Sequence, residues 1–138
     1  MATAIVTGAA GFLGSHLCDY LLENGYSVIG LDNLLTGNPK NLEQAKRNRS
    51  FQFLRHDICK PISIKGGVER IYNLASPASP VDYQRYPIET LDAGSYGVRN
   101  MLELAREKHA RFLQASTSEV YGDPKEHPQR EAYWGNVN

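Results

Sequence analysis

The chain has 138 residues with 15 acidic and 15 basic side chains, so it is long enough for one domain, and its zero net charge gives no electrostatic reason to bind nucleic acid. No apolar run approaches the roughly 20 residues of a membrane span, and the two cysteines and four histidines lack metal-ligand spacing. We therefore expect one domain over residues 1–138 of a reduced, cytoplasmic protein, with no signal peptide, no membrane partner and no metal site.

The first predicted element is a buried strand over residues 3–6, which leads into Gly8, Gly11 and Gly14 and then into a helix. Gly8 permits the turn off the strand, Gly11 lets the backbone approach a pyrophosphate, and Gly14 lets the helix lie close to the sheet. The helix would then direct its free N–H groups and its dipole at the phosphates. Three glycines alone also occur in surface loops, but a strand before them and a helix after them predict a nucleotide diphosphate cradle.

A helix over residues 12–23 and a second strand over residues 27–32 follow. Asp32 ends this strand 18 residues after Gly14, where a carboxylate can accept both hydroxyls of an adenosine ribose. No Arg or Lys follows before Lys40, which favours NAD over NADP as the cofactor. The alternative is that Asp32 only caps the turn after the strand.

Residues 33–39 are rich in turn formers, and we expect one short, exposed helix in the polar stretch that runs to Arg49. A third strand over residues 51–55 ends at His56-Asp57-Ile58. Asp57 could meet the adenine amino group and Ile58 the adenine ring. A turn acid beside a core isoleucine explains the same residues equally well.

A fourth strand over residues 70–74 leads into a proline-rich loop over residues 75–80, which we expect to be stiff. One long helix is predicted from Pro87 to about Lys108. Gly94 and Gly97 lie inside it at a cost of about 1 kcal/mol each relative to Ala, so we expect the cofactor or another helix to pack closely there. A fifth strand over residues 111–115 then leads into a polar, irregular tail.

Strands that alternate with helices predict an α/β fold with a doubly wound parallel sheet in the order 3-2-1-4-5. The carboxyl ends of parallel strands meet at one edge of the sheet, and an open sheet of this kind binds its ligand there. We therefore expect Gly11, residues 76–79 and residues 117–119 to be neighbours.

These segments resemble the extended short-chain dehydrogenase/reductases of the nucleotide-sugar epimerase and dehydratase group. The resemblance covers essentially the whole chain and implies a Rossmann fold that lacks the later strands and the sugar-nucleotide domain. It rests on residues 7–14, 32–33, 56–58, 74–80, 116–124 and 133–138. The last three segments together are most similar to the UDP-glucuronate decarboxylases of this group.

The resemblance implies that NAD⁺ takes a hydride from C4 of a nucleotide sugar and returns it after chemistry on the 4-keto sugar. Thr117 matches the family's catalytic Ser/Thr, which hydrogen-bonds the C4 oxygen, and Glu119 matches a glutamate that abstracts the C5 proton in dehydratases. The implied cofactor contacts are Gly8, Gly11, Phe12, Leu13, Gly14, Asp32, Asn33, Asp57, Ile58, Leu74, Ala75 and Ala78. The implied substrate contacts are Ser79, Pro80, Tyr83 and Ser118.

Ser118 stands where the dehydratases carry an Asp that can protonate the departing C6 hydroxyl. An alcohol cannot serve as that general acid, because its pKa is far above neutrality. A 4-keto glucuronate, a β-keto acid, loses CO₂ with no oxygen leaving group to protonate. Ser118 therefore favours decarboxylation of UDP-glucuronate to UDP-xylose, although it could be a small filler, and Glu119 could be only an ion-pair partner. A dTDP-glucose 4,6-dehydratase, a nucleotide-sugar 4-epimerase and a non-catalytic NAD-binding module remain alternatives.

In the resembling enzymes the catalytic Tyr-x-x-x-Lys motif follows the Trp-Gly-x-Val-Asn segment, and no such motif follows that segment here. Tyr121 and Lys125 have the same spacing but lie before it. In this motif the lysine lowers the tyrosine pKa, so that the tyrosine can accept the C4 hydroxyl proton. We expect the 138-residue chain to lack turnover on its own.

Many relatives also carry Asn where Gly94 stands. Family members commonly form homodimers through the helix that matches residues 87–108. Tyr83 and Arg85 could meet the sugar, but a solvated turn explains them equally well.

Overall fold

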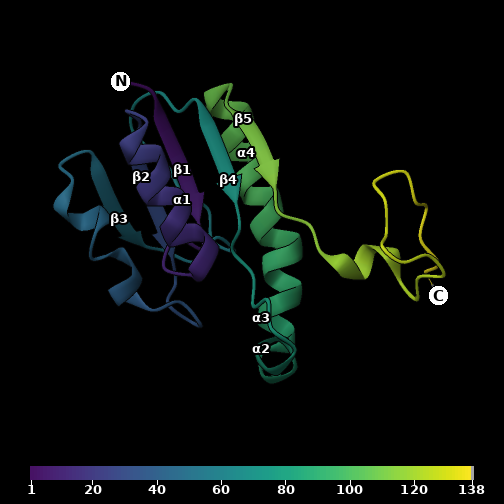
Figure 1. Cartoon of the computed structure of the whole chain (residues 1–138). Helices are drawn as coiled ribbons and strands as arrows, with labels where there is room; N and C mark the ends of the chain where they lie inside the picture. Colours follow the sequence, from purple (N-terminus) through teal and green to yellow (C-terminus); the bar gives the residue numbers. More distant parts are fainter. Residues whose placement is uncertain (138) are drawn as a thin grey trace.

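The computed structural model describes residues 1–137, and Asn138, the last residue of the 133–138 segment, lies outside the described residues. Five strands form one sheet in the order β3-β2-β1-β4-β5, and all four neighbouring pairs are parallel (Figure 1). The strands are β1 (Thr3–Thr7), β2 (Ser27–Asp32), β3 (Phe51–Arg55), β4 (Arg70–Asn73) and β5 (Arg111–Gln114). The predicted doubly wound α/β sheet and its strand order are confirmed.

Helices cover both faces of the sheet because neighbouring residues of a buried strand point to opposite faces. Helix α1 (Phe12–Glu23) contributes Cys18 and Leu21 to a core cluster that contains Ala4 and Val6 of β1. Helix α4 (Val98–Lys108) contributes Met101, Leu104 and Ala105 to the second cluster, which contains Ile5 and Ile71. The central strands β1, β2 and β4 are therefore covered on both sides, as parallel sheets require, whereas β5 is largely exposed.

The segment after β4 differs from the prediction of a loop followed by one long helix. Helix α2 (Pro80–Arg85) begins inside the expected loop, because the Ser79 hydroxyl accepts a hydrogen bond from the Asp82 N–H at 3.1 Å and Pro80 occupies the first helical position. Helix α3 (Pro87–Asp92) and α4 are joined by a π-helical segment, Ala93–Gly97. The predicted helix is therefore continuous in direction but contains a wide turn.

Two short 3₁₀ turns, Pro39–Leu42 and Ala45–Arg47, replace the single exposed helix expected in the polar stretch. Leu42 and Ala45 are fully buried against α1 and β1. Since two apolar side chains anchor the segment to the core, it is less exposed than its polar composition predicted. Within residues 1–137 no helix is long and apolar enough to cross a bilayer.

The tail beyond β5 runs away from the sheet, and its yellow end lies far from α1 in Figure 1. It contains a 3₁₀ turn, Ser118–Tyr121, and folds on itself: the Asn136 N–H donates to the Tyr121 carbonyl at 2.8 Å, and the Tyr121 and Tyr133 rings stack. The expectation that residues 117–119 neighbour Gly11 is therefore wrong for this structure, because the tail packs on itself rather than across the sheet edge.

Candidate active site at the carboxyl edge of the sheet

The turn from β1 into α1 has the close packing that the glycine spacing predicted. Gly8 has a φ of +65°, and its carbonyl accepts a hydrogen bond from the Gly11 N–H at 3.0 Å. A Cβ on Gly14 would lie 2.0 Å from the Gly8 carbonyl oxygen. Only glycine at residue 14 therefore allows α1 to start this close to the turn.

The first turn of α1 is open toward solvent. Gly11 occupies the N-cap position and supplies no side-chain cap, while the Phe12 and Leu13 side chains are exposed. A Cβ on Gly11 would approach only the Gly8 carbonyl oxygen, at 3.2 Å, so the outer side of Gly11 is free. Uncapped N–H groups at a helix N-terminus, with no side chain over them, form an arrangement that suits a phosphate.

Asp32 joins this turn to the end of β2. Its side chain is buried, one carboxylate oxygen accepts from the Ala10 N–H at 2.9 Å, and the other accepts from the Leu34 N–H at 2.8 Å. The carboxylate thus does cap the turn, as the alternative proposed. Each oxygen can accept a second hydrogen bond, so these contacts leave capacity for ribose hydroxyls. Beside it, the Asn33 side chain accepts from the Leu35 N–H at 2.9 Å.

In the loop after β3, Asp57 is a hydrogen-bonded carboxylate and Ile58 is a buried core residue. The Asp57 carboxylate accepts from the Cys59 N–H at 3.0 Å. Burial acts to raise the Asp57 pKa, but hydrogen bonds from Cys59 and Asn33 and the charge of Lys60 outweigh it, so the pKa is lowered and the group is anionic at neutral pH. Ile58 is only 4% exposed and belongs to the second core cluster, which fits the core-isoleucine alternative.

A buried polar network that the sequence analysis missed ties the loop after β4 to the turn after β1. The Thr7 hydroxyl donates to Asn73 Oδ1 at 2.6 Å and accepts from the N–H groups of Leu74 and Ala75, both at 3.0 Å. Asn73 Nδ2 in turn donates to Gln114 Oε1 of β5 at 2.8 Å. The network fixes the carboxyl ends of three strands, and its only sequence signal is a polar residue at the end of each apolar strand.

The start of the loop after β4 lies against Gly8 of the glycine turn. A Cβ on Gly8 would come within 3.1 Å of the Ala75 backbone. Farther along, Ala78 and Pro80 are exposed and Tyr83 is half-buried in α2. The Ser79 hydroxyl donates to the Asp82 carboxylate at 2.6 Å, so this side chain caps α2 in the present structure.

The hydroxyl and carboxylate groups of the tail form a local cluster. The Thr117 hydroxyl donates to the Glu119 carboxylate, and the Ser118 hydroxyl approaches the same carboxylate at 3.4 Å. All three residues are exposed. The structure therefore brings the predicted catalytic residues together, but apart from the predicted cofactor contacts (Figure 1).

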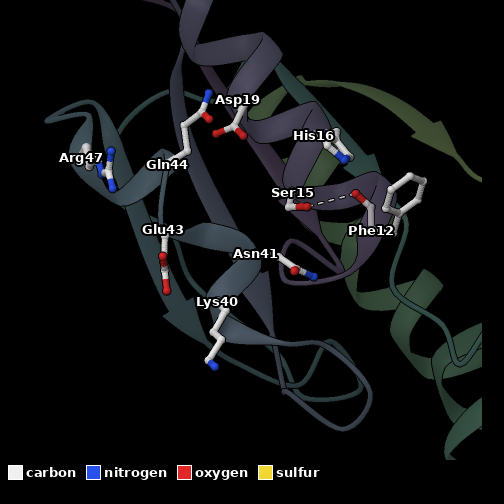
Figure 2. Close-up of a pocket in the computed structure, with 9 residues that line it drawn as sticks. All are labelled: Phe12, Ser15, His16, Asp19, Lys40, Asn41, Glu43, Gln44 and Arg47. Carbon is white, nitrogen blue, oxygen red and sulfur yellow. Dashed lines mark hydrogen bonds between the residues drawn. The ribbon is translucent and has the colours of Figure 1, made fainter.

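A hollow of about 390 Å³ lies on the outer side of α1, between this helix and the two 3₁₀ turns (Figure 2). The sequence analysis did not single it out, because its lining is the polar face that any amphipathic helix shows. Among residues 1–137, Asp19 has a buried Oδ1 without a hydrogen-bond partner, and burial followed by the charge of Glu23 raises the Asp19 pKa. The lining residues are Phe12, Ser15, His16, Asp19, Lys40, Asn41, Glu43, Gln44 and Arg47. No cluster of His, Cys, Asp or Glu in the described part of the chain could hold a metal ion.

Comparisons with known proteins agree with this fold. A family model described as GDP-mannose 4,6 dehydratase matches residues 5–134. The chain is 53% identical over 134 residues to UDP-glucuronic acid decarboxylase 1 of Arabidopsis thaliana, covering 97% of this chain and 30% of that protein. It is 50% identical over 134 residues to UDP-glucuronic acid decarboxylase 1 of Danio rerio, covering 97% of this chain and 32% of that protein.

Solved structures of similar fold are nucleotide-sugar epimerases. A UDP-galactose 4-epimerase has a TM-score of 0.81 and 31% identity, over 97% of this chain and 44% of that one. The UDP-glucose 4-epimerase from Bifidobacterium longum, solved in complex with NAD⁺ and UDP, has a TM-score of 0.83 and 26% identity, over 95% of this chain and 42% of that one. The chain thus spans about a third of the curated relatives and less than half of these structures. Because the family model covers nearly all of it, the chain belongs to the GDP-mannose 4,6 dehydratase family of nucleotide-sugar short-chain dehydrogenase/reductases.

Proposed function

We propose that the chain is the cofactor-binding part of an NAD-dependent UDP-glucuronate decarboxylase, which forms UDP-xylose through a 4-keto sugar. The observation that carries the proposal is the identity of 53% to a UDP-glucuronic acid decarboxylase over 97% of the chain. The open N-terminus of α1 and the buried Asp32 carboxylate, which lie at one end of the sheet, support the cofactor assignment.

The residues fit NAD at the carboxyl edge of β1 and β2. The backbone N–H groups at the start of α1 would hold the pyrophosphate, and Asp32 would accept the ribose hydroxyls of the adenosine half. The absence of a lysine or arginine between Asp32 and Lys40 leaves no cation for a 2′-phosphate in that interval. When bound, NAD⁺ supplies a hydride acceptor for the sugar C4 and returns the hydride at the end of the cycle.

The tail residues would handle the sugar. Thr117 would hydrogen-bond the C4 oxygen and hold the sugar for oxidation, and its hydroxyl already faces the Glu119 carboxylate. Ser118 offers no proton of suitable pKa to a leaving hydroxyl, so loss of CO₂ from the β-keto acid is the reaction that this loop favours. The tail must lie nearer the start of α1 than it does here for these groups to share a substrate with the cofactor.

Product analysis on the full-length gene product tests the reaction. With UDP-glucuronate and NAD⁺, we expect release of CO₂ and formation of UDP-xylose, with no net reduction of NAD⁺. The Thr117→Val variant should lose about a hundredfold in kcat, because it removes a hydrogen bond to the reacting oxygen. The neighbouring Ser118→Ala variant is the matched comparison and should still decarboxylate. A product that keeps its C6 carboxylate would instead indicate an epimerase and overturn the proposal.

We also propose that the protein forms a homodimer through α3 and α4. Ile88, Leu91, Tyr96 and Leu102 are exposed along these helices, and monomeric proteins rarely leave such an apolar stripe uncovered. A shallow hollow of about 410 Å³ lies on the same side of α4. A second copy of this helix pair would cover the stripe, as the family resemblance implies.

A further inference from the structure

The loop after β3 is held by helix α4 at one residue, Ile58. Gly97 is buried, and a Cβ at this position would lie 2.6 Å from Ile58 Cδ1 and 2.8 Å from Ile58 Cγ1. Both separations are well below van der Waals contact, so no other residue type fits at 97 unless Ile58 moves. The expectation that the cofactor or another helix packs closely on the helix glycines is met only in part at Gly97, where the close neighbour is Ile58 of a loop. At Gly94 it is not met, since nothing lies within 4 Å of a Cβ built there.

Asn100, about one turn farther along the helix, hydrogen-bonds the backbone of Ile58. Its side-chain Nδ2 donates to the Ile58 carbonyl oxygen at 2.8 Å. Residues 97 and 100 share a helix face because they are three positions apart. The side chain of Ile58 is therefore located by Gly97, and its backbone by Asn100. The π-helical segment Ala93–Gly97 lies between α3 and α4, and such wide turns often accompany functional sites.

The start of this loop, at His56, lies beside Asp32, the residue proposed to bind the ribose. The His56 N–H donates to the Asp32 carbonyl at 3.0 Å, so the loop starts beside the residue that would hold the ribose. Asp57 then accepts from the Cys59 N–H, and the Lys60 N–H donates to the Asp57 carbonyl at 2.9 Å. These bonds make residues 56–60 a compact turn, so a shift at Ile58 would be passed on to Asp57.

We propose that Gly97 and Asn100 are positioning residues for the adenine end of the nucleotide site, where they fix Asp57 and Ile58 relative to Asp32. The inference rests on the proposed function, since it takes the carboxyl edge of β2 and β3 as the adenosine side of an NAD site. Helix α4, which we propose as part of the dimer interface, would then also affect the affinity for the nucleotide.

Gly97→Ala and Gly94→Ala form a matched pair to test this, because each adds one methyl group to the same helical segment. At residue 97 the methyl group meets Ile58, and at residue 94 it meets nothing within 4 Å. We expect Gly97→Ala to bind both NAD⁺ and AMP about tenfold more weakly, as overpacking by one methyl group displaces the loop. Gly94→Ala should match the parent. Calorimetric titrations are made at a temperature at which circular dichroism shows every variant folded.

Two further variants separate positioning from a general loss of stability. Ile58→Val removes Cδ1, the atom nearest the added methyl group, so it should restore part of the affinity in the Gly97→Ala background. Asn100→Leu, which keeps the size of the side chain but not its donor, should weaken AMP and NAD⁺ binding by similar factors. It also replaces Gly97→Ala as the test if that variant does not fold.

The outcomes distinguish this inference from the proposed function. If the folded parent chain binds neither NAD⁺ nor AMP, both fail. If the parent binds and both Gly97→Ala and Asn100→Leu bind equally well, even with lower melting temperatures, the contacts are only structural and the inference alone is overturned. A loss in Gly97→Ala and Asn100→Leu that Gly94→Ala does not share supports it.

Discussion

Replacing Gly14 with alanine is expected to lower the free energy of unfolding by about 3 kcal/mol or more. The added Cβ would lie 2.0 Å from the Gly8 carbonyl oxygen, 2.7 Å from the Gly8 carbonyl carbon and 3.0 Å from the Ala9 Cα. All three are backbone atoms of the turn, so no side chain can rotate away to relieve the overlap. Helix α1 would have to lift from β1, which would open the core cluster that Cys18 and Leu21 share with the sheet.

Urea unfolding of the 138-residue chain measures this effect. Gly94→Ala is the control, because it makes the same substitution in a helical segment where a Cβ meets nothing within 4 Å. That variant should keep the parent stability or gain up to about 1 kcal/mol from helix propensity. Equal midpoints for Gly14→Ala and the parent would show that α1 is not as tightly packed on the turn as the structure has it.

The second large effect is expected from Thr7→Val, which removes one hydroxyl with little change of shape. The Thr7 side chain is fully buried and uses its whole hydrogen-bonding capacity on Asn73, Leu74 and Ala75. Without the hydroxyl, one buried amide oxygen and two N–H groups lose their partner. Each unsatisfied group costs about 1–3 kcal/mol, so we expect a loss of at least about 3 kcal/mol.

Thr3→Val is the matched control for this variant, since it makes the same change at the other end of β1, where the residue is only partly buried. It should shift stability by less than about 0.5 kcal/mol. Chemical denaturation with circular dichroism gives both values. If the two threonine variants lose the same small amount, the buried network does not hold the sheet edge together.

The fold could be predicted from the sequence where local signals and tertiary packing agree. The spacing of Gly8, Gly11 and Gly14 fixed the first turn because each glycine meets a separate steric demand, and at Gly14 the overlap is severe for any other residue. The strand bounds, correct to within one residue, followed from short apolar runs such as the one that ends at Asp32. The strand order is the usual one for a doubly wound sheet of this kind.

Elsewhere a local signal was present but was assigned to the wrong element. Ser79 and Pro80 are a helix-start pair, yet the prolines around them favoured a loop, and α2 was missed. The wide turn at Ala93–Gly97 ends at a glycine that packs against Ile58, far away in sequence. No periodicity in a single segment can reveal such a contact.

In the candidate site, too, local features could be predicted from the sequence and contacts between distant residues could not. The hydrogen bond between Thr7 and Asn73 joins residues 66 positions apart, so the sequence showed only two polar residues at strand ends. The position of Thr117 relative to the glycine turn depends on how the exposed tail lies against the sheet. Residue type and spacing within the tail predicted its local cluster but not its direction.

Titration of NAD⁺ into the 138-residue chain by isothermal calorimetry tests the central claim, that this edge of the sheet is a dinucleotide site. We expect binding that Asp32→Asn weakens by at least about tenfold, because a charged acceptor for the ribose hydroxyls is lost. Glu69→Gln should not weaken it, since Glu69 is an exposed acid beside the amino end of β4, at the opposite edge of the sheet. A folded chain that binds no NAD⁺, or binds it equally well in both variants, would contradict the claim.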